Sequence, residues 1–298
     1  MFKRILVPLD GSELAKQALP VAITIAQQNQ GEIILVRIPV LTKMPVPSGI
    51  GGLKLFDEQM TFRQDQCESY LGYIRQTYVD ANVPMRVYVE EGDAASVIVD
   101  TAVAEDVDLI VMTTHGRTGF RRWVLGSVTE KVMRHATCPV LAVRDGGIPE
   151  DIIITLDGSE LAEHSVEPGL ALARAFEAHV TLLRVLEPVE ELDEEERAHI
   201  RPEDQAWLFT LPEAMHQNAL DYLEQITARY AETFPHLKFA VTTNHAAEGI
   251  IDFAERHDMD LIVMTTHGDT GIGRWTYGSV TEKVVWSTPC SMLVIRSL

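Results

Sequence analysis

The sequence has few cysteines, no long apolar run and no excess of positive charge, and each shortage excludes a class of protein. Three cysteines in 298 residues are too few and too scattered for a disulfide framework or a cysteine-based metal cluster. No run approaches the roughly 18–20 apolar residues of a membrane span, and the first residues lack the long apolar stretch of a signal peptide. We therefore expect a cytoplasmic protein without a membrane partner.

The net charge of −19 at pH 7 is concentrated in the second half of the chain. Residues 1–148 carry 15 Lys and Arg against 17 Asp and Glu, whereas residues 149–298 carry 10 against 27. Because a phosphate backbone favours clustered Lys and Arg, this acidity argues against a nucleic-acid partner. The acidic run within residues 187–204 indicates a solvated insertion, with a docking surface for a basic partner as the alternative.

Two stretches of the chain are each written twice. Residues 5–15, Ile-Leu-Val-Pro-Leu-Asp-Gly-Ser-Glu-Leu-Ala, recur almost unchanged at residues 152–162, an offset of 147. A glycine-bearing stretch, residues 113–130, recurs at residues 265–282, an offset of 152. A repeat of about 150 residues has the size of a domain rather than of a solenoid unit.

Each repeat alternates short apolar runs with segments of helical periodicity. In the first repeat we expect strands at residues 5–7, 33–38, 85–89, 109–112 and 140–143, and helices at 12–29, 56–78, 94–104 and 128–135. A Pro- and Gly-rich loop is expected at residues 39–52, and the second half repeats the order of elements. Strands separated by helices and apolar on both faces predict an α/β fold with a parallel sheet. The expected domains are residues 1–145 and 149–298.

Polar residues follow the first and fourth strands of each repeat. In an open parallel sheet, ligands bind beyond the carboxyl ends of the strands. If the first and fourth strands are neighbours, Asp10 and the loop from Thr113 face one crevice, as do Asp157 and the loop from Thr265. Asp10 could accept hydrogen bonds from a ribose or base, or it could merely cap the helix that follows.

A helix begins after each glycine-bearing loop, and its N-terminus suits an anion. Gly126 would let a ligand approach the backbone, so a phosphate could use the N–H groups of residues 126–128 together with the Ser127 hydroxyl. The alternative is that Ser127, in the capping box Ser-Val-Thr-Glu, only caps its helix. His115 and His267 have no acid or nucleophile at useful spacing, so we interpret them as packing residues.

With these residues in place, the chain resembles the tandem members of the universal stress protein family. The ATP-binding signature of that family is Gly-x-x-Gly, nine residues, then Gly-Ser or Gly-Thr. Gly116, nine residues and Gly126-Ser127 fit it, and so do Gly268, nine residues and Gly278-Ser279. The resemblance implies two doubly wound domains, each a five-stranded parallel sheet of order 3-2-1-4-5, that bind ATP, alone or with Mg²⁺.

The resemblance also implies site residues in both halves. Asp10 and the backbone of Ile38 would bind adenosine, with Asp157 and Val185 as their second-half equivalents. The further nucleotide contacts implied by the resemblance are Pro8, Leu9, Met112, Thr113, Gly116, Arg117, Gly126, Ser127, Val128 and Thr129 in the first half, and Leu156, Met264, Thr265, Gly268, Gly278, Ser279, Val280 and Thr281 in the second.

Members of the family commonly pair through their last strand. In this chain the two halves could pair residues 140–143 with residues 292–295 and form a built-in pseudo-dimer, with a homodimer of whole chains left open.

The sequence departs from the family signature in ways that bear on binding. Thr113 and Thr265 replace its first glycine. The phosphate loops also differ, with Arg117 in the first opposite Asp269 in the second, and a carboxylate beside a triphosphate is repulsive. We therefore expect the N-terminal half to be the better ATP site.

The function implied is a stress-response protein that binds ATP as a sensor or switch. The alternatives are an interaction scaffold with weak or lost nucleotide binding, and a slow ATP hydrolase. We expect no efficient catalysis, because neither loop has a dedicated base or a pair of metal-binding carboxylates nearby.

Overall fold

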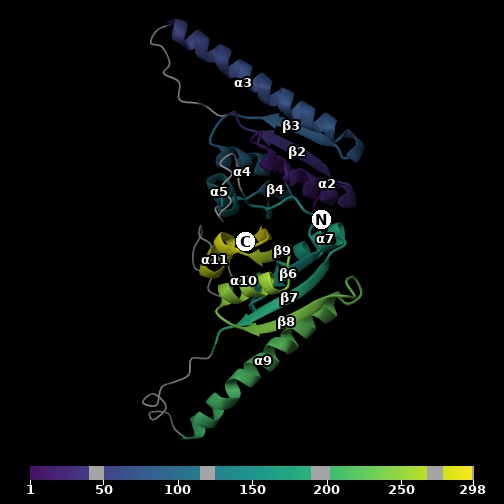
Figure 1. Cartoon of the computed structure of the whole chain (residues 1–298), viewed down its shortest axis with the longest axis vertical. Coiled ribbons are helices and arrows are strands. Elements are labelled where there is room, and N and C mark those ends of the chain that lie inside the picture. Colours follow the sequence, from purple (N-terminus) through teal and green to yellow (C-terminus); the bar gives the residue numbers. More distant parts are fainter. Residues whose placement is uncertain (40–49, 115–124, 189–201, 267–277, 297–298) are drawn as a thin grey trace. The chain divides into compact units, whose positions relative to one another are not determined.

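The computed structural model describes residues 1–39, 50–114, 125–188, 202–266 and 278–296, with the backbone alone at residues 50–59 and 202–210 (Figure 1). Its contacts divide it into two compact units. Unit 1 comprises residues 1–148 together with 291–296, and unit 2 comprises the described residues between 149 and 290.

Unit 1 alternates strands and helices along the chain. Its elements are β1 (Arg4–Pro8), α1 (Glu13–Lys16), α2 (Ala18–Asn29), β2 (Glu32–Arg37), α3 (Ile50–Thr77), the 3₁₀ turn η1 (Val79–Ala81), β3 (Met85–Val89), α4 (Ala94–Ala104), β4 (Leu109–Thr113), α5 (Ser127–His135) and β5 (Val140–Val143). The last strand of the chain, β10 (Ser291–Ile295), also belongs to this unit.

Unit 2 repeats the same order of elements. They are β6 (Asp151–Thr155), α6 (Glu160–Glu163), α7 (Val166–Phe176), β7 (His179–Leu186), α9 (Pro202–Tyr230), β8 (Lys238–Thr243), α10 (Ala246–Arg256), β9 (Leu261–Thr265) and α11 (Ser279–Ser287).

The sheet of unit 1 has the strand order β3-β2-β1-β4-β5, and these five strands are parallel. The interior strand β4 is buried along its whole length, whereas the edge strand β3 is half exposed. In unit 2, the parallel order β8-β7-β6-β9 repeats the first four positions. The predicted tandem α/β class with strand order 3-2-1-4-5 is confirmed.

Strand β10 pairs antiparallel with β5, as expected for the last strands of the two repeats. Leu293 lies opposite Leu141, and the Arg144 N–H donates to Ser291 Oγ at 3.2 Å. The β5 edge, an apolar Val-Leu-Ala-Val strand, is therefore covered by the end of the same chain.

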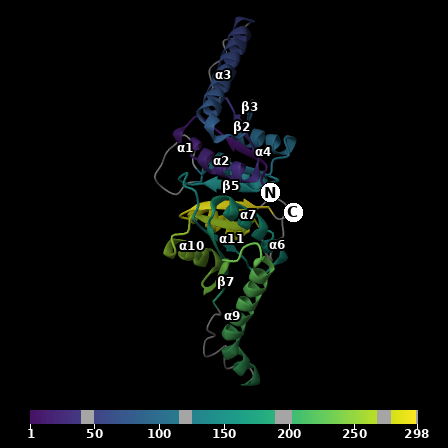
Figure 2. The ribbon, with the colours of Figure 1, turned by 90° about the vertical axis from the view of Figure 1, so that its right-hand side faces the viewer.

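The helices of unit 1 lie on two faces of its sheet. From β1 through β2 to β3 the chain moves across the sheet in one direction, and from β3 through β4 to β5 it moves in the opposite direction. Each crossover between parallel strands is right-handed, so a reversal of direction places the connecting helices on the other face. Helices α2 and α3 must therefore share one face, and α4 and α5 the other. Helix α2 packs on β1, β2 and β4, α3 packs on β2 and β3, and α4 contacts α5 (Figures 1 and 2).

Two expected elements begin or divide differently in the structure. The helix expected at residues 12–29 is split at Gln17, because Pro20 has no N–H for the Lys16 carbonyl and its ring crowds that group. Pro168 divides α6 from α7 in the same way. Helix α3 starts at Ile50, so the end of the loop expected at residues 39–52 is helical.

Candidate functional site

The predicted site requires the first and fourth strands of each repeat to be neighbours at the switch point of the sheet. Strand β1 pairs with β2 on one side and with β4 on the other, and the connections that leave β1 and β4 run to opposite edges. In unit 2, β6 lies between β7 and β9. The adjacency on which the predicted site depends is therefore present in both repeats.

The turn after β1 fixes Asp10. Asp10 Oδ1 accepts the Ser12 N–H at 2.8 Å, and Ser12 Oγ accepts the Ala15 N–H at 3.1 Å. Ser12 is thus the N-cap of α1, and the alternative that Asp10 caps this helix is wrong. Asp10 instead closes a local turn at the end of β1 through its Oδ1.

The second repeat builds the same turn. Asp157 Oδ1 accepts the Ser159 N–H at 2.9 Å and the Ser159 hydroxyl at 2.6 Å, and Ser159 caps α6 through the Ala162 N–H. The residue before each aspartate, Leu9 or Leu156, is buried, and Pro8 is half buried.

The backbone of Ile38 presents a donor and an acceptor beside this turn. The Val36 carbonyl faces β1 and accepts the Leu9 N–H at 2.8 Å. Backbone groups alternate sides along a strand, so the N–H and C=O of Ile38 point to the same side as the Val36 carbonyl, toward β1. The pairing of β1 with β2 ends at Pro8 and Val36, so Ile38 lies beyond its last pair. The hydrogen bonds of the described residues use neither group.

Val185 has the same placement in unit 2. The Leu183 carbonyl accepts the Leu156 N–H at 2.9 Å, so the N–H and C=O of Val185 point past the end of β6. An N–H and a C=O side by side on one strand edge match the donor–acceptor edge of a nucleobase.

Two hydrogen bonds join the end of β4 to the start of α5. The Thr129 hydroxyl donates to the Thr113 carbonyl at 2.9 Å, and the Gly126 N–H donates to the Thr114 carbonyl at 2.7 Å. We call these two bonds the loop closure, because they bring together the two ends of the glycine-bearing loop.

Unit 2 contains the same loop closure with one extra acceptor. The Thr281 hydroxyl lies 3.0 Å from the Thr265 carbonyl and 3.3 Å from the Thr266 carbonyl. The Gly278 N–H donates to the Thr266 carbonyl at 2.8 Å.

The serine of the signature lies at the first position of each helix. Gly126 is the N-cap of α5, with φ −64° and ψ 141°, and the helix begins at Ser127, whose side chain is exposed. The alternative that Ser127 caps its helix is therefore wrong, and Ser279 is placed alike behind Gly278. Since the Gly126 N–H is donated to Thr114, the open helix end starts with the N–H groups of Ser127 and Val128. Val280 occupies the equivalent second position of α11.

Threonine at the first signature position fits the strand without strain. Thr113 and Thr265 end β4 and β9, are 8% and 6% exposed, and neither has a positive φ. Met112 and Met264 precede them and are buried. The backbone conformation here does not need glycine.

Several predicted residues lie outside the described part of the chain. They are Gly116, Arg117 and Gly268, along with His115, His267 and Asp269. The expectation that the first half binds better depends on Arg117 and Asp269, so it stays a prediction.

The described residues offer no metal centre of their own. Among them, no group of three or more His, Cys, Asp or Glu side chains converges on a point. None of the helices in the described ranges has the length and apolarity needed to cross a bilayer.

Sequence reasoning missed an arginine behind each site aspartate. Arg37 ends β2 and Arg184 lies near the end of β7, and each packs on a tyrosine from the next helix, Tyr70 or Tyr222. The available signal was a charged residue after an apolar run at the same offset of 147 in both repeats.

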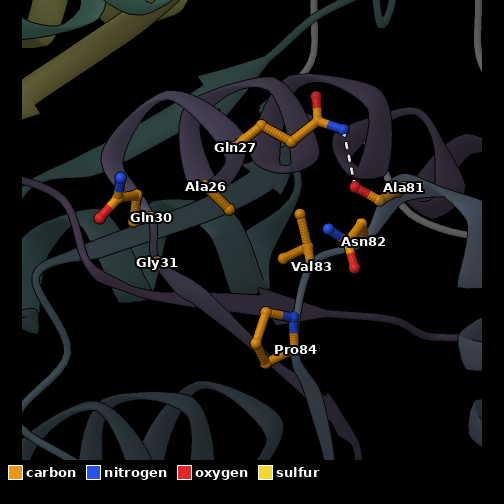
Figure 3. Close-up of a pocket in the computed structure, with 8 residues that line it drawn as sticks. All are labelled: Ala26, Gln27, Gln30, Gly31, Ala81, Asn82, Val83 and Pro84. Atoms are coloured by element: carbon orange, nitrogen blue, oxygen red, sulfur yellow. Dashed lines mark hydrogen bonds between the residues drawn. The ribbon is translucent and has the colours of Figure 1, made fainter.

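A hollow of about 620 Å³ lies elsewhere on unit 1. It is bordered by the end of α2 and by the segment before β3, where Gln27 Nε2 donates to the Ala81 carbonyl at 2.8 Å (Figure 3). Gly31 and Pro84 in its wall precede β2 and β3, so this hollow faces the amino ends of the strands, opposite the candidate site.

Comparison with known proteins gives the same family for both halves. The universal stress protein family model matches residues 1–144 and 150–296. A universal stress protein of Methanocaldococcus jannaschii is 31% identical over 144 residues, which are 48% of this chain and 83% of that protein. Another, from Thermus aquaticus, is 34% identical over 145 residues, covering 48% of this chain and all of that protein.

A solved structure shares the whole architecture. The universal stress protein of Archaeoglobus fulgidus aligns with a TM-score of 0.72 over 99% of this chain and 98% of its own, at 19% identity, so the likeness shows the fold alone. Both halves match the family model and both build the same turn, strand edge and loop closure. The chain therefore belongs to the universal stress protein family and carries two of its domains.

Proposed function

We propose that this protein binds an adenine nucleotide, ATP being the expected ligand, and acts as a stress-responsive sensor or switch. Base, ribose and phosphate would each meet a different feature of one crevice. In the first repeat these are the Ile38 backbone, Asp10, and the helix end at Ser127 and Val128. In the second they are Val185, Asp157 and Ser279.

The backbone edge of Ile38, which the hydrogen bonds among the described residues do not use, carries the proposal. A strand that continues past its neighbour leaves an N–H and a C=O to be satisfied, and they lie beside the Asp10 carboxylate at the switch point. Val185 and Asp157 repeat the pair in unit 2. Two copies of the same arrangement in halves of very different charge support a shared ligand.

The first repeat is proposed as the stronger site. Arg117 in its phosphate loop would attract a triphosphate, and the corresponding loop of the second repeat has Asp269. Mg²⁺, if it accompanies ATP, would come with the phosphates, because the described residues supply no carboxylate cluster for it.

The remaining features of the proposal concern the whole chain. We propose domains at residues 1–145 and 149–298, a cytoplasmic location, and an internal pseudo-dimer through β5 and β10. Since β10 covers the β5 edge, a homodimer of whole chains would have to use another surface.

The test is to identify and then titrate the nucleotide. Mass spectrometry of small molecules released on denaturation would show any retained ligand, and calorimetry with ATP would give the affinity and the number of sites. Asp10→Asn keeps an acceptor for the Ser12 N–H but removes the charge offered to the ribose. We expect it to weaken the first site by about 10-fold or more, because a hydrogen bond to a charged group contributes roughly 1.5–3 kcal/mol. Asp157→Asn is the matched change for the second site.

The outcomes separate the candidate functions. Neither retained nucleotide nor measurable heat would refute nucleotide binding and favour an interaction scaffold. Steady phosphate release that Ser127→Ala abolishes, in a variant that still binds ATP, would favour a slow hydrolase. Nucleotide bound only in the second half would refute the proposed order of the two sites.

A further inference from the structure

Arg37 lies against the turn that carries Asp10. A methyl group built on Gly11 would come within 2.5 Å of Arg37 Nη2 and 3.0 Å of its Cζ, so the guanidinium covers this glycine. The guanidinium also lies over the Tyr70 ring, with Cζ 4.2 Å from the ring centroid. The arginine is thus enclosed between the turn after β1 and helix α3.

Unit 2 contains the same three residues. A methyl group on Gly158 would come within 2.9 Å of Arg184 Nη2, and Arg184 Cζ lies 5.1 Å from the centroid of Tyr222 on α9. Gly11 and Gly158 have φ of +88° and +94°, a backbone conformation that side chains rarely adopt.

Neither arginine forms an ion pair among the described residues. Both are half buried, and each guanidinium lies over a tyrosine ring in a cation–π contact. A half-buried guanidinium without a carboxylate is costly, so its presence in both repeats needs a common reason. Lysine or an apolar residue would fill the space, but only a flat guanidinium can stack on a ring and on a glycine turn at once.

The Tyr70 and Tyr222 hydroxyls do not explain the stack. Both hydroxyl oxygens are buried, and that of Tyr70 has no hydrogen-bond partner in the described part of the chain. Burial raises the pKa of Tyr70, while the nearby charges of Lys16 and Arg37 lower it. The contribution of each tyrosine is therefore its ring.

The turn needs an outside contact to fix its direction. Glycine has no side chain that could anchor it, and a glycine at positive φ has wide conformational freedom when uncovered. Asp10 uses Oδ1 for the Ser12 N–H, so the direction of its other oxygen depends on the turn. The guanidinium restricts that turn from the side of α3.

We propose that Arg37 and Arg184 are positioning residues for the two site aspartates. Each arginine, stacked on Tyr70 or Tyr222, presses on the glycine after the aspartate and sets the direction in which the carboxylate meets its ligand. This inference depends on the proposed nucleotide function for its consequence in affinity, but not for its effect on the turn.

The experiment measures the turn and the ligand separately. Amide hydrogen exchange of the peptide spanning residues 9–16 is compared between wild type, Arg37→Met, Tyr70→Leu and Tyr70→Phe, all without nucleotide. Faster exchange is expected in the first two variants, with Tyr70→Phe, which keeps the ring, as the matched control that stays at the wild-type rate. Tyr70→Leu leaves Arg37 in place and serves if Arg37→Met fails to fold.

ATP titrations then measure the consequence for binding. The Asp157→Asn background weakens the second site, so that ATP binding reports mainly on the first. In this background, Arg37→Met is expected to raise the Kd for ATP by about 10-fold. Combined with Asp10→Asn, the arginine change should add little, because both act through one carboxylate. Arg184→Met in an Asp10→Asn background is the mirror experiment.

The possible outcomes are distinct. If wild type binds no ATP, the proposed function fails, and exchange in the residue 9–16 peptide alone decides this inference. Unchanged exchange in Arg37→Met and Tyr70→Leu would overturn it. So would a lower melting temperature with an unchanged Kd, or a loss of affinity that simply adds to that of Asp10→Asn.

Discussion

Replacing Thr129 with valine tests whether the loop closure stabilises unit 1. Thr129 is 3% exposed and its hydroxyl donates to the Thr113 carbonyl at 2.9 Å. Valine keeps the shape and removes the donor. A buried internal hydrogen bond contributes about 1 kcal/mol, and depriving a buried carbonyl adds to that, so we expect the free energy of unfolding to fall by about 1–2 kcal/mol. For a unit of this size, each kcal/mol lowers Tm by about 2–4 °C.

Urea unfolding followed by circular dichroism measures the change, and Thr137→Val is the matched control. Thr137 is exposed, so the same substitution there should change stability by no more than about 0.5 kcal/mol. Thr281→Val removes a donor shared by two carbonyls, and its effect on unit 2 should be at least as large.

Two results would contradict a stabilising role for the Thr129 hydroxyl. If Thr129→Val unfolds at the wild-type urea concentration, the hydroxyl contributes nothing and the loop closure depends on the Gly126 bond alone. If Thr137→Val is equally destabilising, the effect belongs to the exchange of threonine for valine in general and not to the lost hydrogen bond. We also expect Thr129→Val to lower the ATP affinity of the first site, and Thr137→Val to leave that affinity unchanged.

Four further outcomes are expected. Gly72→Ala in α3 should raise the free energy of unfolding by about 0.5–1 kcal/mol, because alanine is preferred over glycine within a helix and its methyl group would meet nothing within 4 Å. Gly31→Ala should lower the free energy of unfolding by about 1–3 kcal/mol, because its methyl group would lie 2.5 Å from the Lys3 carbonyl oxygen. Urea unfolding of both variants measures the opposite signs. Cys138 should react slowly with iodoacetamide at pH 8 in the native protein, because burial raises its pKa to about 11; a rate equal to that of free cysteine would contradict this. Hydrogen bonds from the backbone N–H of Ala246 and, to a smaller extent, from the His245 side chain lower the pKa of Glu187. The contribution of these contacts to the stability of the fold is therefore complete above an unfolded pKa near 4.5 and disappears as the pH falls through the lower folded value. Between pH 6 and pH 3.5, wild type should therefore lose more stability than Glu187→Gln, and parallel pH profiles would count against the contact.

The fold was predictable because its signals are local and repeated. Buried parallel strands read as apolar runs, helices as periodic segments, and the two offsets of 147 and 152 mark two copies of one domain. The pairing of β5 with β10 was implied by the family resemblance, and it covers an apolar edge. The prolines at 20 and 168 also carried a signal, since each divides a helix that the periodicity alone joins.

The site was predictable only in part. Asp10 and the crevice followed from the strand order, but the role of Ser127 depended on where the helix starts, and Gly126 takes the capping position through its bond to Thr114. The stack of Arg37 on Tyr70 joins residues far apart in sequence, and no local pattern reports which face of α3 meets β2.

The pairing of β10 with β5 has a consequence for the order in which the protein is made. Unit 1 receives its last strand only after the whole second repeat has been synthesised, so a nascent first repeat carries an open apolar edge while the second half of the chain is made. A ribosome that stalls within the second repeat would leave that edge exposed to a neighbouring nascent chain. Completion of the second repeat thus also protects the first from joining the wrong partner.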